Sequence, residues 1–287
     1  MDRASSLEPG LLPLPRPLMA GEMLDAAFRL FRASLLRCLP YSGLTILLLQ
    51  MPTLYATLTS GGPTTYRVTH VVGRSLVPSG ALNDRTLVYI AVLLLGVLLI
   101  GALTLRMHEV SRGLRPRFRT EIPTALKRWP TAIIATTGAL LFPLVLAFAA
   151  SIVRSMVPAE VIVVLGTPLL WPTAILVPAL PAFWCDGLGP FAAIARSVRV
   201  ARRGTWRVVG ALFTTLCIVT VFYVLAAIGV GLLSPAFGSA DLVVIAIVTS
   251  LLWIVFGAIG VPFVLAVLIV AYEDLKLRDA ERRGLWA

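Results

Sequence analysis

Long uncharged apolar runs alternate with shorter charged segments along the whole chain. A helix needs about 20 apolar residues to cross the hydrocarbon core of a membrane. Six runs reach that length, over residues 39–58, 86–105, 131–153, 161–184, 208–233 and 242–271. The pattern therefore predicts an all-α, polytopic bundle of six transmembrane helices, in one membrane domain over residues 21–273. We expect a disordered cytoplasmic tail over residues 1–20 and a cytoplasmic C-terminal tail over residues 274–287.

The composition is that of a chain whose solvent is mostly lipid. Hydrophobic residues occupy 58% of the positions, charged residues occupy 14%, and the mean hydropathy is +0.91. A soluble domain usually has about a quarter of its residues charged. The net charge of +11 comes from basic residues between the apolar runs, and the aromatic residues are not spaced as stacking platforms. We therefore expect contact with anionic lipid headgroups and not with nucleic acid.

The basic residues are distributed unequally between the connections. Of the 25 lysines and arginines, four follow odd-numbered spans, namely Arg67, Arg74, Arg85 and Arg154. The other 21 precede an odd-numbered span or follow the sixth. Because cytoplasmic loops carry the excess of Lys and Arg, this asymmetry predicts that both termini are cytoplasmic.

A charged amphipathic segment precedes each odd-numbered span. These segments predict three interfacial helices in the headgroup plane, over Gly21–Arg37, Thr120–Trp129 and Pro190–Arg207. Pro130 is expected to mark the turn from the second of them into the third span. The chain then consists of three copies of one unit, an interfacial helix followed by two spans. This arrangement indicates a threefold internal repeat.

Two stretches of sequence resemble a known family. RPLMAGEMLDAAFRLFRASLLRCLP, at residues 16–40, resembles the opening of the membrane-domain family named after glycerophosphoryl diester phosphodiesterase. FAAIARSVRVARRGTWRVVG, at residues 191–210, is similar to the second basic segment of that family. The resemblance implies a six-helix protein of the bacterial inner membrane. It does not imply phosphodiesterase activity, because in a few members that activity belongs to a fused soluble barrel, and only residues 274–287 follow the sixth span.

Residues that could support catalysis are scarce. No predicted span carries a charge in its middle, which disfavours intramembrane catalysis and proton relays. The cysteines and histidines, Cys38, Cys185, Cys217, His70 and His108, lack the spacing of metal ligands. We therefore predict no catalytic, cofactor or metal site. Asp186 follows the fourth span and is expected to form an interfacial salt bridge with an arginine of the next helix.

Prolines interrupt the fourth predicted span at Pro168, Pro172, Pro178 and Pro181. Each proline removes a backbone donor and bends the helix. The carbonyl groups freed in this way could line a cavity and bind a solute, as in a transporter. The alternative is a kinked helix that serves packing alone.

Charged residues outside the spans provide two further kinds of candidate site. Two arginine clusters are candidate anionic-lipid contacts, formed by Arg112, Arg115, Arg117 and Arg119 and by Arg196, Arg199, Arg202 and Arg203. Glu22, Asp25 and Arg29 share one face of the first amphipathic helix, with Asp25 and Arg29 spaced as an i,i+4 ion pair. The two carboxylates could hold the basic loops of another copy of the unit.

Three functions remain open at this point. The first is a non-enzymatic scaffold or regulatory component of a membrane assembly, which agrees with the lack of buried charge. The second is a transporter or lipid-handling protein that uses the proline-broken fourth span. The third is an enzyme acting on lipid headgroups, which would require Asp186, Glu22, Asp25 or His108 to converge. A cavity that reaches the prolines would favour transport, and a closed bundle would favour the scaffold.

Overall fold

The structure is a computed structural model that describes residues 12, 14, 16–59, 84–114, 116–140, 145, 170–202, 204–233 and 242–284. Every regular element among these residues is an α-helix. The helices are α1 (Ala20–Thr59), α3 (Asp84–Ser111), α4 (Phe118–Ala139), α7 (Leu170–Leu176), α8 (Ala179–Trp184), α9 (Pro190–Ala201), α10 (Thr205–Leu233) and α11 (Leu242–Arg282). The predicted all-α class is confirmed for the described chain.

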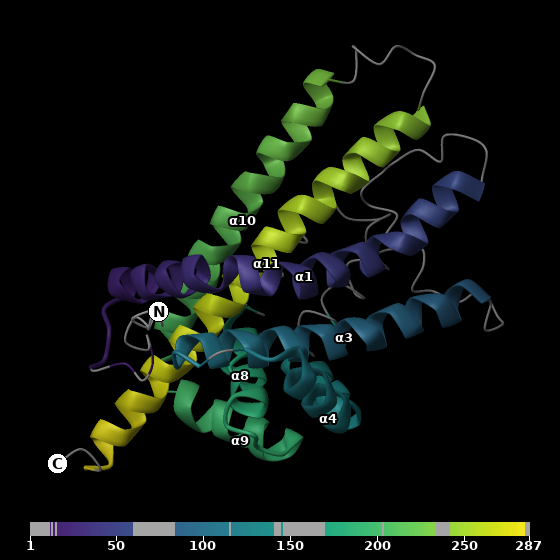
Figure 1. The fold of residues 1–287 in the computed structure, drawn as a ribbon. Helices are drawn as coiled ribbons and strands as arrows, with labels where there is room; N and C mark the ends of the chain where they lie inside the picture. The colour runs from purple at the N-terminus through teal and green to yellow at the C-terminus, as the bar shows by residue number, and fades with distance from the viewer. Residues whose placement is uncertain are drawn as a thin grey trace, which may run out of the picture.

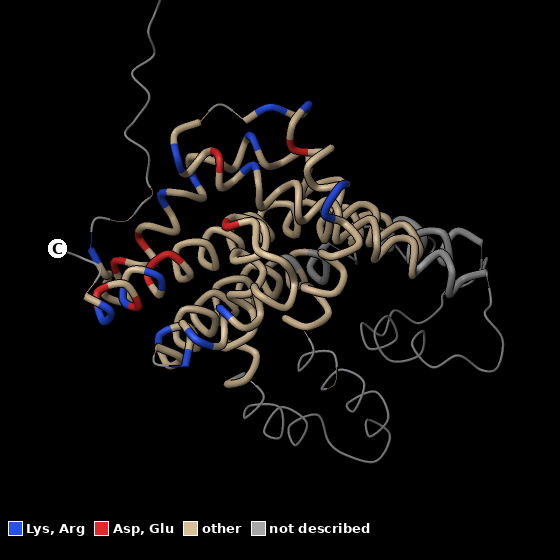
Figure 2. The backbone as a smooth tube through the Cα atoms, turned by 90° about the horizontal axis from the view of Figure 1, so that it is seen from below, with Lys and Arg blue, Asp and Glu red and all other residues tan. Residues whose placement is uncertain are grey.

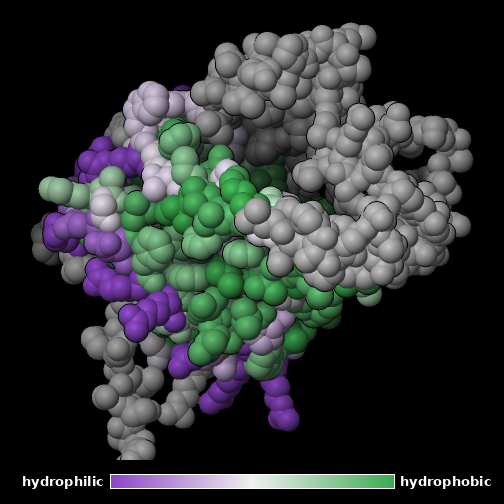
Figure 3. All heavy atoms as spheres, turned by 90° about the horizontal axis from the view of Figure 1, so that it is seen from above, coloured by the Kyte–Doolittle hydropathy of each residue, from purple (hydrophilic) through white to green (hydrophobic). Residues whose placement is uncertain are grey.

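Four of these helices, α1, α3, α10 and α11, are long and apolar enough to cross a membrane. They run side by side so that the start of α1 and the end of α11 lie at the same end of the molecule (Figure 1). The charged residues coloured in Figure 2 gather toward that end. A continuous hydrophobic surface lies beside the hydrophilic edge in Figure 3. The arrangement is that of a multi-pass membrane protein.

The C-terminal half of α11 is the centre of the bundle. Its residues from Phe263 to Leu275 include an almost continuous buried run, and α1 packs along it more extensively than along any other helix. Phe263 joins the two helices, with its ring centroid 4.9 Å from Phe28 and 5.6 Å from Phe31. By contrast, only 6% of the membrane-spanning window of α10 is buried. Helix α10 therefore forms the outer wall, where its apolar side chains would face lipid.

Two of the three predicted interfacial helices are not separate elements. Each is continuous with the span that follows it, so the prediction is wrong for these two. Helix α1 runs unbroken through the charged segment 21–37 and the span 39–58. Helix α4 likewise continues through Pro123 and Pro130, so Pro130 does not mark a turn. The apolar face of the charged part of α1 is buried in the main core while most of its charged side chains stay at the surface, and this packing extends the span as one helix.

The third amphipathic segment agrees better with its prediction. Helix α9 is separate from α10, and Arg202 and Gly204 between them are in turn conformation. It packs against α8, α4 and α7, below α3 in Figure 1. The third and fourth predicted spans fall largely on residues 141–169, of which the structure describes only residue 145.

Parts of both predicted tails are ordered. Leu12, Leu14 and Leu18 are buried in the main core, so the expected disorder over residues 1–20 does not hold for this part. At the other end, α11 continues to Arg282. Ion pairs at i,i+3 and i,i+4 spacing stabilise this extension and include those from Lys276 to Glu273 and from Arg283 to Asp279.

Gly101 allows α3 to approach α8 closely. A Cβ atom at this position would lie 2.3 Å from the buried ring of Trp184, which is too near for an unshifted structure. We expect Gly101→Ala to lower the free energy of unfolding by about 1–3 kcal/mol, the usual cost of overpacking. Chemical denaturation of the detergent-solubilised protein measures the change.

Gly96→Ala in the same helix is the matched control, because nothing lies within 4 Å of its added Cβ. Alanine is the better helix former, so Gly96→Ala should be neutral or stabilising. Equal losses in the two variants would contradict the close α3–α8 contact.

Candidate functional site

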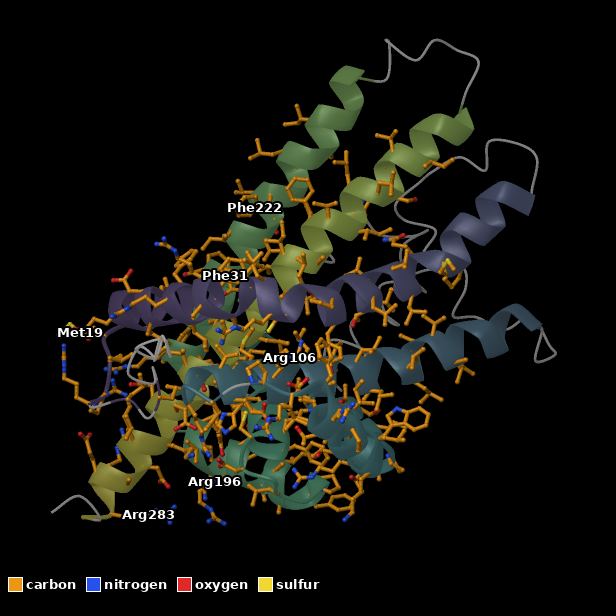
Figure 4. All side chains as sticks on the ribbon, in the orientation of Figure 1. Met19, Phe31, Arg106, Arg196, Phe222 and Arg283 are labelled. Atoms are coloured by element: carbon orange, nitrogen blue, oxygen red, sulfur yellow. The ribbon has the colours of Figure 1, made fainter. Side chains whose placement is uncertain are left out.

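The charged end of the bundle is held together by three ionic groups that involve residues from distant parts of the chain. We name them the Glu121 cluster, the Asp186 cluster and the Asp274 clamp. Figure 4 labels Arg106 of the Glu121 cluster and Arg196 of the Asp186 cluster. Two of these groups contain a buried acidic side chain, Glu121 in one and Asp274 in the other.

The Glu121 cluster joins α1, α3 and α4. Arg106 Nη2 lies 2.9 Å from Glu121 Oε2, and Arg106 Nε donates to both carboxylate oxygens at 3.0–3.1 Å. Tyr41 donates its hydroxyl to Glu121 Oε2 at 2.9 Å. A second guanidinium nitrogen of Arg106 donates to the Arg37 carbonyl oxygen at 2.8 Å. Phe118 stacks on the guanidinium, with its ring centroid 3.7 Å from Cζ.

Both charges of this cluster are removed from solvent. The side chain of Arg106 is 3% exposed and that of Glu121 is 0% exposed. Two buried charges stabilise a fold only when their hydrogen-bonding capacity is filled, and removal of one partner leaves an uncompensated charge. Because the members of the cluster come from three helices, it fixes the relative positions of α1, α3 and α4.

The Asp186 cluster joins the α8–α9 loop to α9 and α11. Tyr272 donates to Asp186 Oδ2 at 2.5 Å and Lys276 donates to Asp186 Oδ1 at 3.1 Å. Arg196 Nε lies 3.8 Å from Asp186 and donates to the Tyr272 hydroxyl at 3.3 Å. The predicted pairing of Asp186 with an arginine of the next helix is confirmed. Burial alone would lower the pKa of Arg196, but the hydrogen bond to Tyr272 and the charge of Asp186 raise it.

Gly187 positions this loop. Its φ of +70° is a conformation that favours glycine, and a Cβ there would lie 2.9 Å from Arg128 Nη2. Arg128 of α4 in turn donates to the Phe183 carbonyl oxygen near the end of α8, at 3.4 Å. The turn directs Asp186 toward α11 and starts α9, with Pro190 in its first turn.

The Asp274 clamp attaches the N-terminal segment to α11. The carboxylate of Asp274 is buried and accepts from the Leu18 backbone N–H at 2.7 Å and from Arg278 Nε at 2.9 Å. Arg278 also donates to the Leu18 carbonyl oxygen at 2.7 Å. Farther along the segment, the Leu12 N–H donates to the Ser111 carbonyl oxygen at 2.9 Å. These contacts hold the N-terminal segment against α11 and α3.

The arginines predicted to contact lipid lie in two separate places. Arg112, Arg117 and Arg119 are exposed around the start of α4, and Arg115 and Arg203 lie outside the described residues. Arg199 and Arg202 line a cleft of about 470 Å³ between α9 and the end of α11. Arg196 is half-buried and belongs to the Asp186 cluster. The structure thus separates a structural arginine from those that face the cleft.

The prolines of the fourth span lie in packed surroundings. Pro178 separates α7 from α8, and Pro178 and Pro181 are buried, while Pro172 is half-buried and Pro168 lies outside the described residues. The Ile175 carbonyl oxygen at the break accepts from Ser197 Oγ of α9 at 2.5 Å. A serine of the neighbouring helix therefore satisfies a carbonyl group at the break. This contact favours the kinked packing helix over a solute-lined cavity for the described part.

The interactions predicted for Glu22, Asp25 and Arg29 differ from those in the structure. Glu22 pairs with Arg16 and accepts from the Met19 N–H at 2.8 Å, so it caps α1 at its third helical position. Asp25 and Arg29 form no ion pair with each other in the described structure. Glu22 therefore serves the start of its own helix in the described structure.

Of the four groups required by a headgroup enzyme, Asp186 and His108 lie near enough to interact electrostatically. Within the described ranges, no hydrogen bond or ion pair joins any two of Asp186, Glu22, Asp25 and His108. His108 is buried, and neither ring nitrogen has a hydrogen-bond partner among the described residues. Burial also raises the pKa of the Cys185 thiol, directly after α8, above its ordinary range. That thiol is therefore protonated at neutral pH and a poor nucleophile.

Sequence analysis missed the Glu121 cluster and the Asp274 clamp. One signal was available for the first, because Glu121 is the single acidic residue between Arg112 and Arg128. An isolated acid in a basic segment indicates a partner among those basic residues. Nothing in the local sequence identifies Leu18 as the partner of Asp274, 256 residues away.

Comparison of the chain with known protein families, with curated proteins and with solved structures finds no match.

The Glu121 cluster predicts a large and non-additive loss of stability. We expect Glu121→Gln and Arg106→Gln each to lower the free energy of unfolding by about 3–5 kcal/mol, because each leaves an unpaired buried charge. The double variant should lose clearly less than the sum. Denaturant titration in detergent, analysed as a double-mutant cycle, measures the coupling.

Asp279→Asn serves as the control, because its ion pair with Arg283 is partly exposed. It should cost less than about 1 kcal/mol. Additive losses for Arg106 and Glu121 would show that the two side chains do not form the buried pair.

Proposed function

We propose that this chain is a non-enzymatic protein of a bacterial inner membrane that scaffolds or regulates a membrane assembly. In this proposal it has six spans and both termini are cytoplasmic. The four described apolar helices and their common charged end support the orientation. The resemblance of residues 16–40 to the phosphodiesterase-type membrane-domain family supports the bacterial inner membrane.

One observation carries the scaffold proposal. Two buried carboxylates of the charged end are paired within the chain, Glu121 with donors from α1 and α3, and Asp274 with Arg278 and the backbone of the N-terminal segment. Such paired and buried carboxylates are poorly placed to meet a substrate or to relay protons, whereas they hold the elements of the charged end together. A rigid cytoplasmic face of this kind suits a partner-binding platform.

The proposed orientation is tested by reporter fusions. Alkaline phosphatase fused after Arg74 should be active, because the enzyme matures only outside the cytoplasm, and the same fusion after Arg115 should be inactive. Green fluorescent protein fused at the C-terminus should fluoresce inside the cell. Phosphatase activity after Arg115 would reverse the orientation.

The scaffold itself is tested by extraction in native lipid with an amphipathic polymer, followed by mass spectrometry of all co-purifying molecules. We expect a protein partner in stoichiometric amount. The partner should be lost from Glu121→Gln, which loosens the charged end, and retained by Asp279→Asn. A solute held stoichiometrically with no protein partner would overturn the scaffold and favour a transporter.

A further inference from the structure

A cleft between α9 and the C-terminal end of α11 is lined by four arginines. Arg199 and Arg202 come from the α9 side, and Arg282 and Arg283 come from the end of α11. The cleft has a volume of about 470 Å³, and among the described residues Asp279 is the single acidic one that lines it. Figure 4 places Arg283 at the end of α11, on the side of the bundle that carries Arg196. We name this feature the arginine cleft.

The charge of the arginine cleft is mostly uncompensated. Asp279 pairs with Arg283 at 2.7 Å. Arg199, Arg202 and Arg282 have no ion pair within the described ranges. Three guanidinium groups that converge without a counter-charge repel one another, and a bound anion would relieve the repulsion. Guanidinium groups match phosphate oxygens best, because their planar donors can bind two oxygens at once.

Both walls of the cleft are held by contacts outside it. Ser197 of α9 donates to the Ile175 carbonyl oxygen at 2.5 Å, and Arg196 donates to Tyr272 of α11. On the other wall, Arg278 is fixed to Asp274 at 2.9 Å. The helices that carry the four arginines are therefore positioned before any ligand arrives, which lowers the entropy cost of binding.

Exposed aromatic residues place the cleft at the level of the lipid headgroups. Phe191 is 74% exposed at the start of α9, and Trp206 is 73% exposed at the start of α10, four residues after Arg202. The ring centroid of Trp206 lies 4.6 Å from that of Trp171. Tryptophan at the end of an apolar helix is typical of the membrane–water interface.

We propose that the arginine cleft binds a phosphate-bearing anion, either the headgroup of an anionic phospholipid or a soluble phosphate ester. Arg199, Arg202 and Arg282 would contact the phosphate oxygens, and the remaining volume accommodates the glycerol or other alcohol esterified to it. The site rests on the proposed cytoplasmic orientation, in which the cleft faces the inner leaflet. It extends the scaffold proposal by giving the rigid face a ligand.

The test compares two double variants of the purified full chain in a neutral detergent. Arg199→Gln/Arg282→Gln removes two charges from the cleft. Arg32→Gln/Lys127→Gln removes two exposed charges outside it. Native mass spectrometry titrates each protein with dioleoyl phosphatidylglycerol, and separately with dioleoyl phosphatidylcholine, glycerol 3-phosphate and inorganic phosphate.

We expect phosphatidylglycerol to bind the wild-type protein in preference to phosphatidylcholine. The cleft variant should bind it about 30-fold more weakly, the effect of two lost headgroup contacts, and added salt should weaken wild-type binding. The control variant should keep an affinity close to that of the wild type. Equal weakening in the two variants, or no preference for the anionic lipid, would overturn the proposal.

The soluble probes identify the source of the phosphate. Phosphatidylglycerol bound without either soluble anion assigns a lipid headgroup. Glycerol 3-phosphate or inorganic phosphate bound at the same arginines assigns a soluble ester.

A second measurement needs no variant. Bound phosphatidylglycerol should protect Arg199, Arg202 and Arg282 of the wild-type chain from phenylglyoxal while Arg32 stays reactive. If a soluble anion is the probe that binds, it should give the same protection. Unchanged modification of all four would contradict the site even if the cleft variant fails to fold. A protein partner without anion binding would overturn the phosphate site and leave the scaffold proposal standing. Anion binding without a protein partner would overturn the scaffold proposal and leave the phosphate site standing.

Discussion

The Arg106–Glu121 ion pair is the interaction on which the charged end of the bundle depends. Removal of two charges from water is costly, and the cost is offset only where geometry and hydrogen bonding are nearly complete. Here the guanidinium reaches the carboxylate, a backbone carbonyl and the face of Phe118, and Tyr41 completes the carboxylate. These ligands come from three helices, so a shift of any one of them exposes an unpaired charge. The pair therefore selects one packing of α1, α3 and α4.

The remaining elements are fastened to this core by polar contacts of the same kind. Asp186 connects the α8–α9 loop to Tyr272 and Lys276 of α11, and Asp274 connects α11 to the backbone of Leu18. Ser197 satisfies a carbonyl at the proline break. In each case a group with unfilled hydrogen-bonding capacity on one element meets its complement on another. Close packing adds to these contacts, as between Gly101 of α3 and the buried ring of Trp184 of α8.

The difference between the buried carboxylates and the exposed arginines bears on function. The buried carboxylates serve architecture, and the arginines that remain unpaired in the described chain lie at the surface, several of them in one cleft. A rigid face with a surface cleft for an anion suits a protein that holds other molecules at the membrane. It suits chemistry less well, because a catalytic carboxylate has to remain accessible to its substrate.

The amino-acid sequence by itself determined the class of the protein, because the bilayer imposes a length and a composition on any helix that crosses it. It also determined the salt bridge of Asp186 with the next helix, since ten residues of local chain separate Asp186 from Arg196. Only the tertiary structure decided that α1 and α4 are continuous, since the packing of neighbouring helices on their apolar faces holds the charged segments in line with the spans. Only it paired Glu121 with Arg106 and Asp274 with Leu18, because such pairs depend on which helices pack together and not on spacing along the chain. Half of the arginine cleft could be predicted from the sequence, because Arg199 and Arg202 belong to an arginine cluster there. Arg282 and Arg283 lie beside them only because α11 extends to Arg282, an extension that ion pairs stabilise.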